Sequence, residues 1–163
     1  MTRLEEFVWH SAYGALPFLH RACDGDPEAD LANHVFLTNH VANRASRAQG
    51  QAFLLACRQL FEAPPLPHGH LAVAFGATLR PHLDREALRH LFLFSALRGA
   101  LSAAVRLGVV GPLRAQRLLL ALHPTLDAAL DETRTLTEAH TLSVRLDAAQ
   151  ATHDALYSRL FQS

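Results

Sequence analysis

The chain has 163 residues, with 15 basic and 15 acidic side chains and a formal net charge of zero. This length suits a single domain over 1–163 that buries its own core, and zero net charge removes the usual electrostatic drive for binding nucleic acid. Leucine (30 residues) and alanine (28) exceed a third of the chain, whereas isoleucine is absent. Because leucine and alanine favour helices and β-branched residues favour strands, the composition predicts an all-α fold.

Helix signals begin at the N-terminus. Thr2 and Glu5 have the spacing of a capping box, which predicts a helix start there. Pro17 lies within the same apolar pattern and is expected to kink or interrupt this helix. Asp26 as a cap and Pro27 at the first helical position predict the start of the next helix.

The stretch from 27 to about 61 is either one long helix or two helices that meet near 46–50, and we favour two because soluble helices much longer than 25 residues are unusual. A proline-rich loop over 63–67 follows. The remaining signals complete a compact bundle of seven to nine helices. They predict helices over 68–79, 84–107, 112–123, 126–133 and 147–160. The threonine-rich stretch over 133–143 is ambiguous, and an irregular connection is one interpretation of it.

The most apolar stretch, residues 91–105, is too short to span a bilayer and contains Arg98. We therefore expect the helix over 85–107 to be a central helix that its neighbours surround, with Arg98 reaching the surface or paired with a carboxylate. The first six residues carry three charged side chains where a signal peptide needs an apolar run. These features predict a cytoplasmic protein that binds neither membrane nor nucleic acid.

No motif predicts catalytic residues or a cofactor. The sequence lacks a phosphate-binding glycine loop, a GxSxG nucleophile motif and the common zinc-ligand motifs. Eleven histidines raise an alternative, a direct nickel or zinc carrier, for which His68 and His70 are the one pair worth testing. For the other histidines, surface or hydrogen-bonded roles are the simpler interpretation.

The C-terminal segment, residues 153–163, is unusually apolar for a chain end because it groups leucine, tyrosine and phenylalanine around Arg159. Aromatic residues and arginine are the types enriched at protein interfaces. A final helix docked on its own domain and a partner-binding segment both fit this pattern, and the two are compatible. A generic helical oligomerisation module is a further alternative.

Several stretches, in the right order, resemble the urease accessory protein F family. They are Arg44-Ala-Ser-Arg-Ala-Gln-Gly50, the loop over 70–76, residues 103–112 with Arg106-Leu-Gly-Val-Val-Gly111 and the later Gln116, and the terminus Tyr157-Ser-Arg-Leu-Phe-Gln-Ser163. The run over 39–42 is closer to the fungal branch of this family. Two departures are visible: Asn43 stands where the family pattern has arginine, and the family's N-terminal Gly- and Pro-containing segment and first helix are missing before Met1.

The resemblance implies an all-α, non-catalytic, chaperone-like scaffold for nickel insertion into apo-urease. Such a protein joins the D-type accessory protein (called H in some bacteria) to the G-type GTPase, modulates GTP hydrolysis and dimerises within that complex. The partner-binding residues that it implies are Tyr157, Arg159, Leu160, Phe161, Ser163, Arg106, Gly111, Gln116, Arg44, Ser46 and Gly50.

Overall fold

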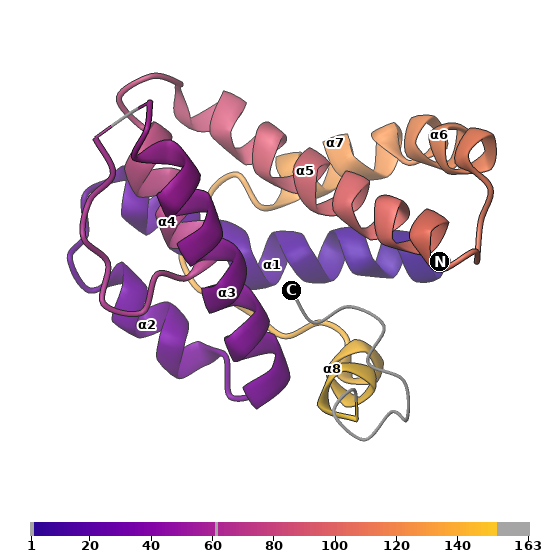
Figure 1. The fold of residues 1–163 in the computed structure, drawn as a ribbon, viewed down its shortest axis with the longest axis horizontal. Helices are drawn as coiled ribbons and strands as arrows, with labels where there is room; N and C mark the ends of the chain where they lie inside the picture. Colours follow the sequence, from indigo (N-terminus) through magenta and orange to yellow (C-terminus); the bar gives the residue numbers. More distant parts are fainter. Residues whose placement is uncertain (1, 61, 153–163) are drawn as a thin grey trace.

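The computed structural model describes residues 2–60 and 62–152. Over these residues the chain forms eight helices and no strand, so the predicted all-α fold is confirmed (Figure 1). The helices are α1 (Arg3–Cys23), α2 (Ala29–Phe36), α3 (His40–Cys57), α4 (Leu71–Leu79), α5 (Arg85–Arg106), α6 (Pro112–Ala121), α7 (His123–Glu132) and α8 (Val144–Ala151).

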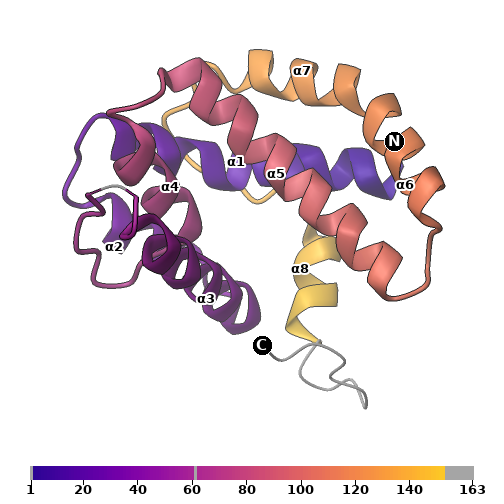
Figure 2. The ribbon, with the colours of Figure 1, turned by 45° about the horizontal axis from the view of Figure 1, so that its top comes forward.

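The central helix is α1, which packs against α2, α4, α5 and α7 (Figure 2). The expectation that the helix over 85–107 is surrounded is therefore wrong. The buried side chains of α5 lie on one face, with Leu97 at 0% exposure, whereas Leu91 is 39% exposed and Arg98 is exposed on the other face. Apolar composition alone misled the prediction, because apolar side chains also contribute much of a folded protein's surface.

Among the described residues, α5 is the one helix long and apolar enough to cross a membrane by length and composition. A core helix of a water-soluble protein passes the same test, and one face of α5 packs against α1, α4, α6 and α7. This helix alone does not indicate a membrane protein.

The capping box at the start of α1 is confirmed, because the Thr2 hydroxyl accepts the Glu5 N–H and the Glu5 carboxylate accepts the Thr2 N–H. The helix then continues through Pro17 without interruption. Proline has no N–H for the carbonyl four residues earlier, that of Tyr13. The His140 N–H donates to the Tyr13 oxygen instead, at 3.1 Å. The free carbonyl of Tyr13 thus ties α1 to the connection before α8, which is irregular over 136–143. This settles the stretch that the sequence left ambiguous.

The break between α2 and α3 lies at 37–39, not near 46–50 as predicted. Asn39 is the N-cap that starts α3, because its side-chain oxygen accepts the N–H groups of Val41 at 3.0 Å and Ala42 at 3.3 Å. This is the usual action of an N-cap asparagine. Gly50 lies inside α3 and does not break it. Because Gly50 has no Cβ, α3 packs closely against the start of α4.

Other helix starts differ by two or three residues from the predictions. Asp26 accepts the Glu28 N–H at 2.8 Å and pairs with Arg21 at 2.6 Å, so it stabilises the turn before α2 and the helix begins at Ala29. α7 begins earlier than expected, at His123, because Pro124 fits the first helical turn. α8 begins at Val144, and the part of the predicted last helix beyond 152 lies outside the described residues.

A buried arginine that the sequence reasoning missed ties α5 to α7. Arg89 has 0% exposure, and its guanidinium donates to the Glu86 carboxylate at 2.8 Å, to the Leu130 carbonyl and to Thr133 Oγ1 at 3.3 Å. The Leu130 carbonyl belongs to the last turn of α7, where a helix dipole favours a positive charge. Arg89 therefore fixes the C-terminal end of α7 against α5.

Candidate partner-binding surfaces

The first candidate surface is formed where α6 folds back against the end of α5. α5 ends at Arg106, and two residues later Gly108 adopts a φ of +70° that suits glycine. The Val109 N–H donates back to the Ala104 oxygen at 2.9 Å. Gly111 then precedes Pro112 at the first turn of α6. This short link reverses the chain, so that the two helices pack side by side.

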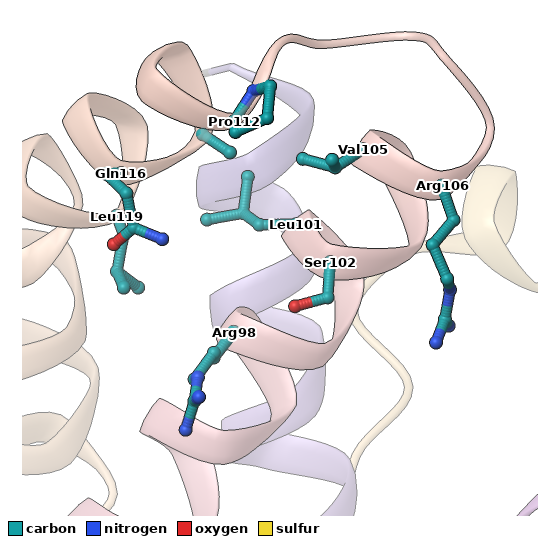
Figure 3. Close-up of a pocket in the computed structure, with 9 residues that line it drawn as sticks. Arg98, Leu101, Ser102, Val105, Arg106, Pro112, Gln116 and Leu119 are labelled. Atoms are coloured by element: carbon teal, nitrogen blue, oxygen red, sulfur yellow. The ribbon is translucent and has the colours of Figure 1, made fainter.

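A pocket of about 310 Å³ lies between the two helices (Figure 3). Two of the predicted partner-binding residues, Arg106 and Gln116, line it, and the Arg106 side chain points away from that of Gln116. The third, Gly111, lines a neighbouring open groove of about 700 Å³. The pocket is lined by Arg98, Leu101, Ser102, Val105, Arg106, Pro112, Ala115, Gln116 and Leu119.

The second group of predicted residues lies on α3. Gly50 is buried, and a Cβ on it would lie 2.0 Å from the Gly69 carbonyl oxygen and 2.9 Å from the His70 carbonyl carbon. Ser46 Oγ accepts the Leu71 N–H at 3.3 Å. Both residues therefore hold α3 against the start of α4, whereas Arg44 is exposed to solvent on α3. The structure thus brings the resembling stretches over 44–50 and 70–76 into contact.

The start of α4 is held by a buried carboxylate. Asp30, which is 3% exposed, accepts the backbone N–H groups of His68 at 2.7 Å, Gly69 at 3.1 Å and His70 at 3.1 Å. Because these donors are bonded to Asp30, α4 begins at Leu71 and not at His68 as predicted. No periodicity in the sequence marks this long-range contact.

His68 and His70, the metal-site candidates, lie together with His34. The rings of His34 and His68 stack with centroids 3.9 Å apart, and His34 Nδ1 lies 3.2 Å from His70 Nε2. Over 2–60 and 62–152, no group of three or more His, Cys, Asp or Glu side chains is arranged to hold a metal ion.

The ring protons of His70 can be placed so that both of its ring nitrogens form hydrogen bonds. The Ser46 hydroxyl, having accepted the Leu71 N–H, has its proton to donate to His70 Nδ1 at 3.1 Å. His70 Nε2 then carries the proton and donates to His34 Nδ1. This arrangement requires a neutral His70 ring, and burial lowers the pKa of His70 to about 4. Asp30 and the other nearby charges modify this effect of burial.

Asn43, the departure from the family pattern, bridges α2 and α3. Its side-chain nitrogen donates to the carbonyl oxygens of His34 at 3.2 Å and Leu37 at 3.1 Å. These carbonyls lie at the C-terminal end of α2, where helical acceptors lack partners. The amide therefore has a structural role that fits this chain.

The other predicted partner residues, Tyr157, Arg159, Leu160, Phe161 and Ser163, lie outside the described residues. Their role at an interface stays a prediction.

Comparison with known proteins identifies the family. A family model described as UreF matches residues 3–123. The chain is 34% identical to urease accessory protein F of Arabidopsis thaliana over 169 residues, which cover 91% of this chain and 70% of that protein. It is 30% identical to urease accessory protein F of Oryza sativa subsp. indica over 170 residues, covering 90% of this chain and 64% of the rice protein. It is 32% identical to urease accessory protein UreF of Rhodopseudomonas palustris (strain BisB5) over 146 residues, covering 83% of this chain and 60% of that protein. The resemblance found in the sequence is thereby confirmed, and the chain belongs to the UreF family of urease accessory proteins.

Proposed function

We propose that this chain is a non-catalytic scaffold for urease maturation. It joins the D-type accessory protein to the G-type GTPase, modulates GTP hydrolysis, and supports nickel insertion into apo-urease in the cytoplasm. The observation that carries the proposal is the family match over 3–123, which spans α1 to α6 and the first residue of α7. The link between α5 and α6 and the joint between α3 and α4 are, together with the terminus over 157–163, the stretches by which the sequence resembles the family.

In this proposal the two regions have different tasks. Gly50 and Ser46 maintain the α3–α4 joint, since their contacts are internal to the chain. Arg44, Arg106 and Gln116 are exposed and meet partners directly. The segment over 157–163 adds to the partner surface, as the resemblance implies. Dimerisation within the complex is part of the same proposal.

The test is direct binding between purified proteins. The chain is mixed with the D-type protein, with the G-type GTPase and with both, and complexes are separated by size-exclusion chromatography with light scattering. We expect a stable complex with the D-type protein and recruitment of the GTPase in the three-protein mixture. GTP hydrolysis is then compared with and without the chain. A folded chain that joins neither partner contradicts the proposal.

A truncated chain ending at residue 156 tests the C-terminal segment. We expect its binding to fall more than its helicity, which circular dichroism reports. If helicity collapses before binding is lost, the segment acts chiefly within the fold and not at the interface.

A further inference from the structure

Although the net charge of the chain is zero, its acidic and basic residues are unevenly distributed along the sequence. No aspartate or glutamate occurs between Glu86 and Asp127, a stretch that covers nearly all of α5 and the whole of α6. Five arginines lie within it: Arg89, Arg98, Arg106, Arg114 and Arg117. Arg89 is buried in the contact with α7, and the other four are exposed. The second half of α5, the link over 107–111 and α6 therefore form one basic surface, which we call the α5–α6 surface.

Three of these arginines have no acidic partner within the described part of the chain. Arg98, Arg114 and Arg117 form none of the ion pairs found among residues 2–60 and 62–152. α6 itself carries no carboxylate, so no pairing with a neighbour three or four residues away is available on that helix. A guanidinium presents a planar set of donors that matches a carboxylate. These side chains are available to carboxylates of another molecule.

Large apolar side chains lie beside these arginines on the α5–α6 surface. Val109 is 77% exposed, Leu113 is 67% exposed and Leu120 is 66% exposed. The open groove along α6 offers Leu113, Leu118 and Ala121 as apolar walls, and Arg114 and Arg117 line the same groove. A rim of arginine around exposed apolar groups is typical of protein–protein interfaces. An apolar side chain of a partner fits this groove while acidic neighbours on the same segment reach Arg114 and Arg117.

We propose that the α6 side of the α5–α6 surface docks an acidic, amphipathic segment of a protein partner, with an apolar side chain in the groove along α6 and carboxylates on Arg114 and Arg117. This rests on the proposed function, in that the segment belongs to one of the other maturation proteins. A symmetric contact between two copies through this surface brings arginines against arginines, which is unfavourable. Nucleic acid leaves the exposed apolar groups without a counterpart, so a protein partner fits the surface better.

The experiment compares two double variants with the same change in net charge. Arg114→Glu/Arg117→Glu alters α6, and the control, Arg58→Glu/Arg80→Glu, alters exposed positions that directly follow α3 and α4. Labelled chains are titrated with the purified D-type protein and with the G-type GTPase, at low and at physiological ionic strength. Helicity and the thermal midpoint are measured for every variant, and Arg114→Gln/Arg117→Gln repeats the test without charge reversal.

We expect the α6 variant to bind at least one partner about tenfold more weakly, with a smaller dependence on salt, because charge pairs at interfaces contribute at this level. We expect the Arg58/Arg80 control variant to stay within about twofold of wild type, because its substitutions lie outside the acid-free stretch. Unchanged binding by the α6 variant overturns the inference while leaving the proposed function standing. Equal weakening by both variants also overturns it, since the effect then follows net charge alone.

Further outcomes distinguish a protein partner from the other possible occupants of the α5–α6 surface. If wild type binds neither purified partner, the proposed function fails and this inference fails with it. If random-sequence duplex DNA binds the chain and the α6 variant weakens that binding, the surface serves nucleic acid and the inference is overturned. If light scattering finds a dimer that only the α6 variant dissociates, a second copy occupies the surface, which also overturns it.

Discussion

Gly50 is the position where one added methyl group tests the packing of the fold most sharply. A Cβ there would lie 2.0 Å from the Gly69 oxygen, 2.8 Å from the Leu71 nitrogen and 2.9 Å from the His70 carbonyl carbon. All three are backbone atoms, which no side-chain rotation moves aside. Gly50→Ala therefore forces α3 away from the start of α4.

Inserting a methyl group into a well-packed contact costs about 1–3 kcal/mol and sometimes more. Alanine recovers about 1 kcal/mol through its higher helix propensity. At 2.0 Å the overlap with backbone is severe, so we expect the upper end of that range. The net loss is about 2 kcal/mol, equivalent to a fall of about 4–8 °C in the thermal midpoint for a chain of this size.

Gly99→Ala is the matched control, because Gly99 also lies inside a helix, α5, but a Cβ there meets no atom within 4 Å. We expect this variant to be more stable than wild type by about 0.5–1 kcal/mol. Urea unfolding followed by circular dichroism measures both free energies. If Gly50→Ala is as stable as wild type, the close approach of α3 and α4 is refuted.

Three further predictions concern buried polar groups. The pKa of His70 lies at about 4 in the fold, below the value of about 6.5 in the unfolded chain, so the unfolded state binds more protons between these values. The free energy of unfolding therefore rises with pH across that window, by up to about 1.4 kcal/mol per pH unit from this residue. Urea midpoints at several pH values measure the slope, and an unchanged slope in His70→Gln contradicts the assignment. Arg89→Met removes the donor to Leu130 and Thr133, and we expect the free energy of unfolding, measured with urea, to fall by about 1–3 kcal/mol. An unchanged free energy of unfolding refutes the stabilising contact between α5 and α7. Asp30→Asn removes the negative charge that accepts three backbone N–H groups, and we expect it to lower the free energy of unfolding by about 2 kcal/mol. We also expect faster hydrogen exchange of the amides at 68–70. Wild-type exchange rates there contradict the role of Asp30 in holding the start of α4.

The sequence predicted those helix ends that are set by hydrogen bonds between residues close together in the chain. The capping box of Thr2 and Glu5 acts within a few residues and is found in the structure, and the helix predicted to begin at 112 begins at Pro112. The excess of leucine and alanine predicted the fold class for the same reason, since helix propensity is a property of single residues. These features need no knowledge of the tertiary contacts.

Long-range contacts account for the wrong predictions. Gly50 looks like a helix breaker until Gly69 is placed against it, and the start of α4 depends on Asp30, far away in the chain. Pro17 looks like an interruption until His140 takes over the free carbonyl of Tyr13. The sequence contains these residues, but their partners follow only from the packing of the helices.

The candidate surface was partly predictable. The resemblance to the family placed Arg106 and Gln116 among the partner-binding residues, and the structure puts them around one pocket. The basic character of α6 was missed because the 15 acidic and 15 basic residues were summed and not mapped along the chain. Locating the carboxylates would have revealed the acid-free stretch between Glu86 and Asp127. Its position beside a pocket required the structure.

The most direct test of the central claim is the activation of apo-urease in a purified mixture. The mixture contains apo-urease, the D-type protein, the G-type GTPase, GTP and nickel, and urea hydrolysis is measured with and without this chain. Membership of the UreF family, with the scaffold role proposed for it, predicts that activation depends on the chain and saturates at a fixed ratio to the D-type protein. Equal activation with and without the folded chain contradicts that account.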